Sequence, residues 1–389
     1  MENSEKRTRY KLYLMYFLLF GGIAGYSPFL PHYFESKGLD YIQIGYCFSL
    51  MSIISIVSQP VLGYLADRWF GRKKTIILLM ILCSISSVFF TYANTFYFIC
   101  FCIVIIGFFQ GAIFPLSDSY IYTISEHKKS IQYGKVRLFG SIGFALVAFG
   151  LGFLLKNSGP SIMFHTYSVL FILAAFFFSR VKFNFSTKSV LPKITDIGLI
   201  LRNRSFSLFL LAVCVSSIAI ISSGNYIAML IEKTGGDTSG LGILWLLVAF
   251  SELPMFYLGT KVLDKFGEIP LFGAALILYS IRFILSSFCT SYILVTIIQL
   301  MQGVSYPLIM LSATSNANKL LPTNLKATGM TLISALGFGL GGFLGNLSSG
   351  FILENFNVFS LFRFYSLVSV IAFVIILIYW KRIGDSKVK

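Results

Sequence analysis

Twelve apolar runs of about 20 residues each recur from one end of the chain to the other, and this pattern limits the fold more than any other feature. A helix of that length crosses roughly 30 Å of hydrocarbon. The runs lie near residues 10–34, 41–66, 74–92, 95–122, 136–156, 161–180, 206–231, 239–260, 270–288, 291–316, 328–353 and 358–380. Because only 12% of the residues are charged and the mean hydropathy is +0.81, the sequence predicts an all-α membrane protein with 12 transmembrane helices.

Lysine and arginine are distributed very unequally between the two sets of alternating loops. One set, with the two ends of the chain, carries 25 of them, whereas the other set carries only Lys37, Lys156, Lys233 and Arg363. The positive-inside rule therefore predicts cytoplasmic termini and a multi-pass protein of the plasma membrane. The net charge of +16 follows from this topology, so the expected surroundings are the lipid bilayer and no nucleic-acid partner.

The chain also divides into two halves at its longest polar interval. We expect an N-terminal six-helix bundle at 1–180, a cytoplasmic loop at 181–204 and a C-terminal six-helix bundle at 205–389. The pattern at 195–202 predicts a short amphipathic helix inside the loop. Repeated helical units of this kind are typical of secondary transporters.

Four charged residues lie deep inside the apolar runs, namely Asp118 and Arg137 in the first half and Glu252 and Arg282 in the second. A charge at the bilayer centre costs roughly 2.5–3.5 kcal/mol on insertion scales, and such residues usually mark a substrate or proton path. The sequence shows neither a nucleophile motif nor cysteines at metal-ligand spacing. We therefore expect a solute transporter without metal, cofactor or enzymatic activity.

Segment 63–73, GYLADRWFGRK, resembles the glycine–acidic–basic loop of the major facilitator superfamily. A weaker echo, KVLDKFG, stands at 261–267. The resemblance implies the major facilitator fold and a tight turn whose charges bridge cytoplasmic helix ends. It assigns this gating role to Gly63, Asp67, Arg68, Gly71 and Arg72.

A narrower resemblance covers nearly the whole chain. Segments 25–31 (GYSPFLP), 58–63 (SQPVLG) and 133–144 (YGKVRLFGSIGF) are similar to the lactose permease branch of oligosaccharide:proton symporters, and the last is also similar to phenylpropionate and nucleoside permeases. The resemblance implies that Arg137 binds substrate hydroxyls and pairs with an acid at Asp118. A guanidinium suits this role because it offers a planar fork of donors. The alternative is a purely structural pair.

Glu252 matches the acid of that family that helps to bind substrate and to couple protons, and Arg282 matches the arginine that eases deprotonation of a nearby acid. The alternative for Arg282 is a structural partner of Glu252. The family's proton-carrying His and Glu of the tenth span are absent, because Gln302 and Ser305 stand there instead. The resemblance therefore leaves Glu252 as the expected proton carrier.

Three further residues are expected to contact substrate. Phe144 replaces the family's sugar-stacking tryptophan and can still stack, while Asn225 and Gln302 can hydrogen-bond a polar solute. The leading hypothesis is proton-coupled uptake, by a monomer and by alternating access, of a small organic solute such as a sugar, an oligosaccharide or a nucleoside. The alternatives are an aromatic acid permease and a proton-coupled exporter of drugs or metabolites. The fifth span lacks the Gly-Pro pair of the superfamily's exporters, which disfavours export.

Overall fold

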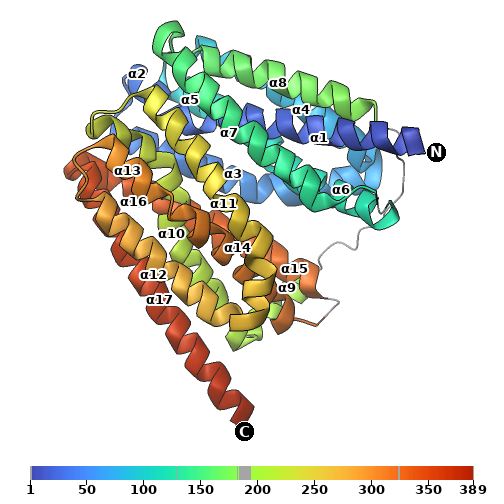
Figure 1. Ribbon diagram of the computed structural model, residues 1–389, viewed down its shortest axis with the longest axis vertical. Coiled ribbons are helices and arrows are strands. Elements are labelled where there is room, and N and C mark those ends of the chain that lie inside the picture. The colour runs from blue at the N-terminus through green and yellow to red at the C-terminus, as the bar shows by residue number, and fades with distance from the viewer. Residues whose placement is uncertain (1, 129, 182, 184–193, 323–324, 389) are drawn as a thin grey trace. The chain divides into compact units, whose positions relative to one another are not determined.

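A computed structural model describes residues 2–128, 130–181, 183, 194–322 and 325–388. In this part of the chain the regular elements are all helical, and 12 candidate spans are long and apolar enough to cross a membrane (Figure 1). The predicted all-α membrane fold with 12 spans is thereby confirmed.

The first six spans are α1 (Glu2–Ala24) with α2 (Leu30–Ser36), α3 (Tyr41–Leu65), α4 (Arg72–Phe89), α5 (Phe96–Gly111) with α6 (Ile113–His127), α7 (Tyr133–Ser158) and α8 (Ile162–Ser179). The last six are α10 (Arg204–Lys233), α11 (Thr238–Phe266), α12 (Glu268–Ser286), α13 (Tyr292–Gln299) with α14 (Gln302–Leu320), α15 (Lys326–Leu332) with α16 (Leu340–Asn355), and α17 (Val358–Val388). Between these two sets lies α9 (Ile194–Arg202), which confirms the short helix predicted at 195–202.

Several spans are interrupted inside the apolar region. The first contains the short helix η1 (Ser27–Phe29), with prolines at Pro28 and Pro31, and the fourth breaks at Ala112. Pro115 explains the second break, because it has no N–H to donate to the carbonyl of Gly111. The tenth span breaks between α13 and α14, and this places Gln302 in the first turn of α14. Interrupted helices at membrane depth occur where the backbone is buried in protein or lines a cavity.

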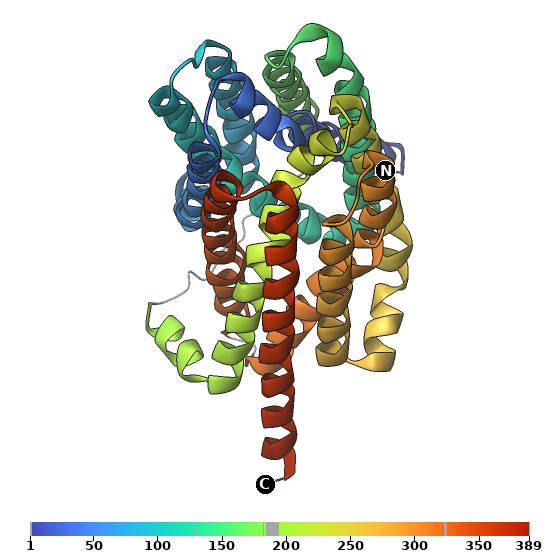
Figure 2. The ribbon, with the colours of Figure 1, turned by 90° about the vertical axis from the view of Figure 1, so that its left-hand side faces the viewer.

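Two compact units make up the chain. Unit 1 comprises Met1–Leu39, Ile53–Val190 and Asp237–Phe250, and unit 2 comprises Asp40–Ser52, Leu191–Gly236 and Ser251–Lys389. In unit 1, α1 packs against α7 and α8 (Figure 1). In unit 2, α17 runs beside α10 and α12, as Figure 2 shows. The division into bundles 1–180 and 205–389 stays a prediction.

Glycines allow the helices of each unit to touch backbone to backbone. The sequence places Gly337, Gly341 and Gly345 one turn apart in the eleventh span, and all three lie against α10. A Cβ atom added to Gly341 or Gly345 would collide with backbone carbonyls of α10, so these small residues permit close helix packing. In unit 1, Gly143 of α7 lies on the backbone of Phe17 in α1. This contact fixes the position of the helix that carries Arg137.

Candidate functional site

Asp118 of α6 is half-buried in unit 1 and is held by a tyrosine hydroxyl. Its Oδ1 accepts a hydrogen bond from the hydroxyl of Tyr16 on α1, and Tyr133 at the start of α7 interacts with the carboxylate electrostatically. Neutral donors of this kind satisfy a carboxylate without adding charge to an apolar environment. Within the described ranges no ion pair of 4.0 Å or less joins Asp118 to Arg137. The expected direct pair is therefore not formed, although the two charges interact electrostatically.

Arg137 of α7 is supported by an aromatic ring instead of a carboxylate. Its guanidinium carbon lies 4.1 Å from the ring centroid of Phe20 on α1. Phe20 meets the ring of Phe114 edge-on, with 4.7 Å between centroids. A cation–π contact contributes about 0.5–2 kcal/mol and leaves the N–H donors at the guanidinium edge unused. Among the residues that the structure describes, none accepts a hydrogen bond from Arg137, so its donor fork is available to a polar solute.

In unit 2, Gln302 connects the half-buried Glu252 and the buried Arg282, the two charges that the sequence assigned to proton coupling. Nη1 of Arg282 on α12 donates to Oε1 of Gln302 over 2.6 Å, and Nε2 of Gln302 donates to Oε1 of Glu252 on α11 over 3.2 Å. Arg282 thus reaches Glu252 through a neutral carboxamide. The sequence assigned Gln302 to substrate binding, whereas the structure places it in the coupling cluster, here defined as Glu252, Gln302 and Arg282.

Arg282 is only 1% exposed, which makes it the most fully buried charge of the coupling cluster. Its guanidinium carbon lies 4.6 Å from the ring centroid of Tyr279 and 4.8 Å from that of Phe283. Its Nε makes no hydrogen bond to any described residue. A buried charge held by one neutral acceptor and two rings is costly to maintain, and such arrangements are typical of functional positions in membrane proteins.

A close approach of the α14 backbone to the α11 backbone, at a glycine, places Gln302 next to Glu252. Gly303 is the next residue of α14, and a Cβ atom at this position would lie 2.5 Å from the carbonyl carbon of Ser251. Only glycine permits this approach, because real Cβ contacts are longer. Ser251 precedes Glu252, so the close contact places the Gln302 carboxamide beside the Glu252 carboxylate.

Asn225 and Phe144, the two other predicted substrate residues, lie in separate environments. Nδ2 of Asn225 donates to Oδ1 of Asn346 over 2.9 Å, and the fully buried Asn346 also donates to Ser52 over 3.3 Å. Asn225 therefore belongs to an internal polar network of unit 2. Phe144 lies edge-on to Trp245 in unit 1, with 5.8 Å between ring centroids.

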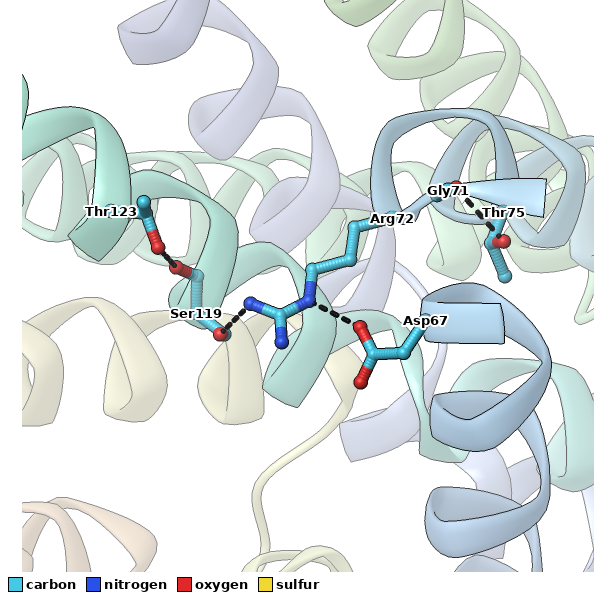
Figure 3. A network of polar contacts seen from close by, with 6 residues as sticks. All are labelled: Asp67, Gly71, Arg72, Thr75, Ser119 and Thr123. Carbon is cyan, nitrogen blue, oxygen red and sulfur yellow. Dashed lines mark hydrogen bonds and ion pairs between the residues drawn. The ribbon is translucent and has the colours of Figure 1, made fainter. Parts of the chain in front are cut away.

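The predicted gating motif folds as a π-helical turn, η2 (Ala66–Phe70), that ends at Gly71. Gly71 has φ +77°, a conformation that glycine adopts readily and other residues rarely adopt. Figure 3 shows that Arg72 then points back to Asp67, with 2.7 Å between Nε and Oδ1, and across to Ser119 on α6, 2.8 Å from Nη1. Arg68 donates to the hydroxyl of Tyr64, so its contact stays local. The motif therefore links the α3–α4 turn to α6.

Gly63 makes no close packing contact, since a Cβ atom there, as at Gly71, would meet nothing within 4 Å. The neighbouring Lys73 donates to the carbonyls of Ser179 and Val181, over 3.0 and 2.7 Å, and so binds the end of α8. The expected bridging of helix ends by the basic residues of this loop is thus present in unit 1.

Unit 2 contains a second polar network that also begins at a glycine turn. Glu268 is the first residue of α12 and follows Gly267, whose φ is +82°. Its Oε1 lies 2.5 Å from Nζ of Lys319 and accepts from Ser315 over 2.9 Å, both on α14. The weak echo at 261–267 therefore introduces a real structural repeat.

Sequence reasoning missed four residues of these sites, namely Tyr16, Phe20, Tyr133 and Trp245. Helical spacing contains the signal for three of them. Tyr133 precedes Arg137 by four residues and Tyr16 precedes Phe20 by four, so each pair shares one helix face. What the sequence alone does not provide is which helices meet, and this pairing of α1 with α7 brings Phe20 under Arg137.

Comparison with known proteins finds similar membrane transporters. The family model described as "MFS_1 like family" matches residues 9–364. The maltose permease of Geobacillus stearothermophilus is 28% identical over 373 residues, which cover 95% of this chain and 94% of that protein. The melibiose permease of Enterobacter cloacae is 24% identical over 338 residues, or 81% and 79% of the two chains. The crystal structure of the nucleoside transporter NupG superposes with a TM-score of 0.83 at 15% identity, covering 96% of this chain and 99% of that one.

Proposed function

Because the chain belongs to the MFS_1 like family, whose members are membrane transporters and not enzymes, we propose that it takes up a sugar together with a proton by alternating access. The coupling cluster is the observation that carries this proposal. It contains a titratable acid and a buried guanidinium inside the apolar spans, joined by one carboxamide.

The chemistry of the coupling cluster suits reversible protonation. While Glu252 is ionised, its carboxylate accepts from Gln302 and offsets the charge of the buried Arg282. When Glu252 takes up a proton, the cluster gains one positive charge, and Arg282 keeps only the Gln302 oxygen and two rings. Loading and unloading of the proton therefore changes the electrostatic balance at the contact between α11, α12 and α14. Such a change is what a coupled conformational switch requires.

Arg137 and the relatives support the proposed substrate class. Arg137 presents a planar fork of donors near Asp118, an acid that accepts a hydrogen bond from Tyr16. Such a fork fits adjacent hydroxyls of a neutral sugar. The two permeases that align over most of this chain are described as transporting maltose and melibiose, and this supports a sugar over a nucleoside or an aromatic acid.

The test is uptake of radiolabelled maltose, melibiose and uridine into membrane vesicles with an imposed pH gradient. We expect wild type to accumulate a sugar against its gradient only when the gradient is present. Glu252→Gln, which resembles the protonated acid, should lose accumulation but retain exchange of labelled for unlabelled sugar, since exchange needs no deprotonation. Glu126→Gln is the matched control, because Glu126 is an exposed acid on α6.

Two results would contradict the proposal. Undiminished accumulation by Glu252→Gln would remove the coupling role of this residue. Accumulation of uridine but of neither sugar would remove the substrate assignment. Arg137→Lys separates binding from folding, because it keeps the charge and loses the fork; we expect a large rise in KM with normal insertion.

A further inference from the structure

Trp245 is a tryptophan inside a span whose indole N–H has no partner. The other two tryptophans, Trp69 and Trp380, are 67% and 48% exposed near span ends, which is the usual place for this residue. Trp245 is half-buried within α11, and its Nε1 is inaccessible and makes no hydrogen bond to any residue that the structure describes. A donor left unsatisfied away from water is costly, so buried tryptophans normally find an acceptor.

The position of Trp245 is fixed by a backbone contact between α7 and α11. Its ring meets Phe144 of α7 edge-on, with 5.8 Å between centroids and 75° between planes. One turn away, a Cβ atom at Gly242 would lie 2.7 Å from the carbonyl oxygen of Ala148. The two rings are therefore held against each other by helices that are already in backbone contact.

Helical spacing relates this aromatic pair, Phe144 and Trp245, to the two charged positions. Phe144 follows Arg137 by seven residues on α7, and Trp245 precedes Glu252 by seven residues on α11. Seven residues are close to two turns, roughly 10.5 Å along the axis, and bring both members of each pair to one helix face. On each helix, the aromatic residue thus lies on the same face as the charged residue, two turns away from it.

We infer that Trp245 contacts the transported solute in a conformation of the transport cycle that uncovers Nε1, donating its indole N–H to a hydroxyl or ether oxygen while its ring and Phe144 form an apolar wall. This inference rests on the proposed uptake of a sugar. A neutral polyhydroxylated solute fits because it offers acceptors for the N–H and C–H faces for the rings, without a charge that the aromatic pair would have to compensate.

Trp245→Phe tests the inference, because it keeps an aromatic ring and removes only the donor. We expect its KM for labelled maltose to rise about 3- to 10-fold with kcat unchanged, the effect of one lost neutral hydrogen bond. Trp245→Ala should raise KM further. Trp380→Phe, the same substitution at an exposed end of α17, is the matched control and should leave both constants at their wild-type values.

A second measurement does not depend on turnover. The difference in fluorescence between wild type and Trp245→Phe isolates the emission of Trp245, and maltose should shift it and reduce its quenching by acrylamide. If wild type transports maltose while KM of Trp245→Phe and the emission of Trp245 are both unaffected, the inference is wrong and the tryptophan only packs. If wild type transports none of the sugars, the proposed function fails, and the inference that rests on it fails with it.

Discussion

Replacing Gln302 by leucine should expose how much the coupling cluster depends on its neutral bridge. Leucine fills a similar volume but neither accepts from Arg282 nor donates to Glu252. Arg282 would then lose its 2.6 Å hydrogen bond while remaining 1% exposed, with an Nε that already has no partner among the described residues.

The size of the effect follows from that geometry. A hydrogen bond to a charged group contributes about 1.5–3 kcal/mol, and a buried group left unsatisfied adds its own desolvation penalty. We expect Gln302→Leu to lower the free energy of unfolding by about 3 kcal/mol, which is roughly a 150-fold change in the folding equilibrium constant. Gln299→Leu provides the scale for comparison. Gln299 is 4% exposed in the same span, but its amide donates to the neutral Ser286 over 3.2 Å, so its loss should cost about 1 kcal/mol.

The assay is reversible unfolding in mixed detergent micelles, applied to a double-mutant cycle of Gln302→Leu and Arg282→Met. Removing both partners eliminates the guanidinium that Gln302→Leu leaves without its acceptor, so the double variant should be more stable than Gln302→Leu alone. The coupling free energy should be about 2 kcal/mol or more. Additive losses in the cycle, or a cost of Gln302→Leu no greater than that of Gln299→Leu, would refute the idea that the carboxamide stabilises a buried guanidinium by hydrogen bonding.

Three more predictions concern packing, pH dependence and topology. Gly152→Leu should abolish transport because a side chain there collides with the backbone of α11, whereas Gly150→Leu, with nothing within 4 Å of its Cβ, should be tolerated; labelled-maltose uptake distinguishes them. Asp237 caps α11 and pairs with Lys156 over 2.9 Å, and the Ser239 hydroxyl and then Lys156 hold the pKa of its carboxyl below the usual range. The contribution of Asp237 to the free energy of unfolding is therefore present above the ordinary carboxyl pKa and is lost as pH falls through the lower pKa of the folded state. Asp237→Ala should lower the free energy of unfolding, measured by thermal unfolding, by about 1 kcal/mol at pH 7 and by less below about pH 4. In sealed cells, an impermeant thiol reagent should label Lys156→Cys but not Lys188→Cys, a position outside the described residues, and the reverse result would invert the predicted topology.

The spans were predictable because their signal is local. Each apolar run is long enough to be read alone, so the count of 12 needed no knowledge of tertiary contacts. The interruptions at Ala112 and after Gln299 were not predicted, since proline and glycine permit a break without specifying it. Those two breaks lie close to Asp118 and Gln302. The sequence therefore did not predict the local backbone geometry that orients these two side chains.

The candidate site was predictable only where a charge stood out against an apolar background. Glu252 and Arg282 were expected to act together, and the structure adds that Gln302 lies between them. Asp118 and Arg137 were expected to pair, whereas Tyr16 hydrogen-bonds to Asp118 and Phe20 lies against Arg137. Neutral polar and aromatic partners are common throughout the apolar spans, so the sequence offers no contrast by which to select them. Tertiary contacts make that selection.

The polar networks of Arg72 and Glu268, each at a glycine turn, show which feature the two halves of the chain share. Arg72 and Glu268 are each the first residue of a helix that follows a glycine with positive φ, and each bonds a serine 47 residues later, Ser119 and Ser315. Their charges are opposite. Glu268 is favoured by the partial positive charge of the helix N-terminus, whereas Arg72 opposes it and depends on the nearby Asp67. The repeated element is therefore the link between a glycine turn and a neighbouring helix, and the sign of the charge is free to change once a counter-charge is supplied.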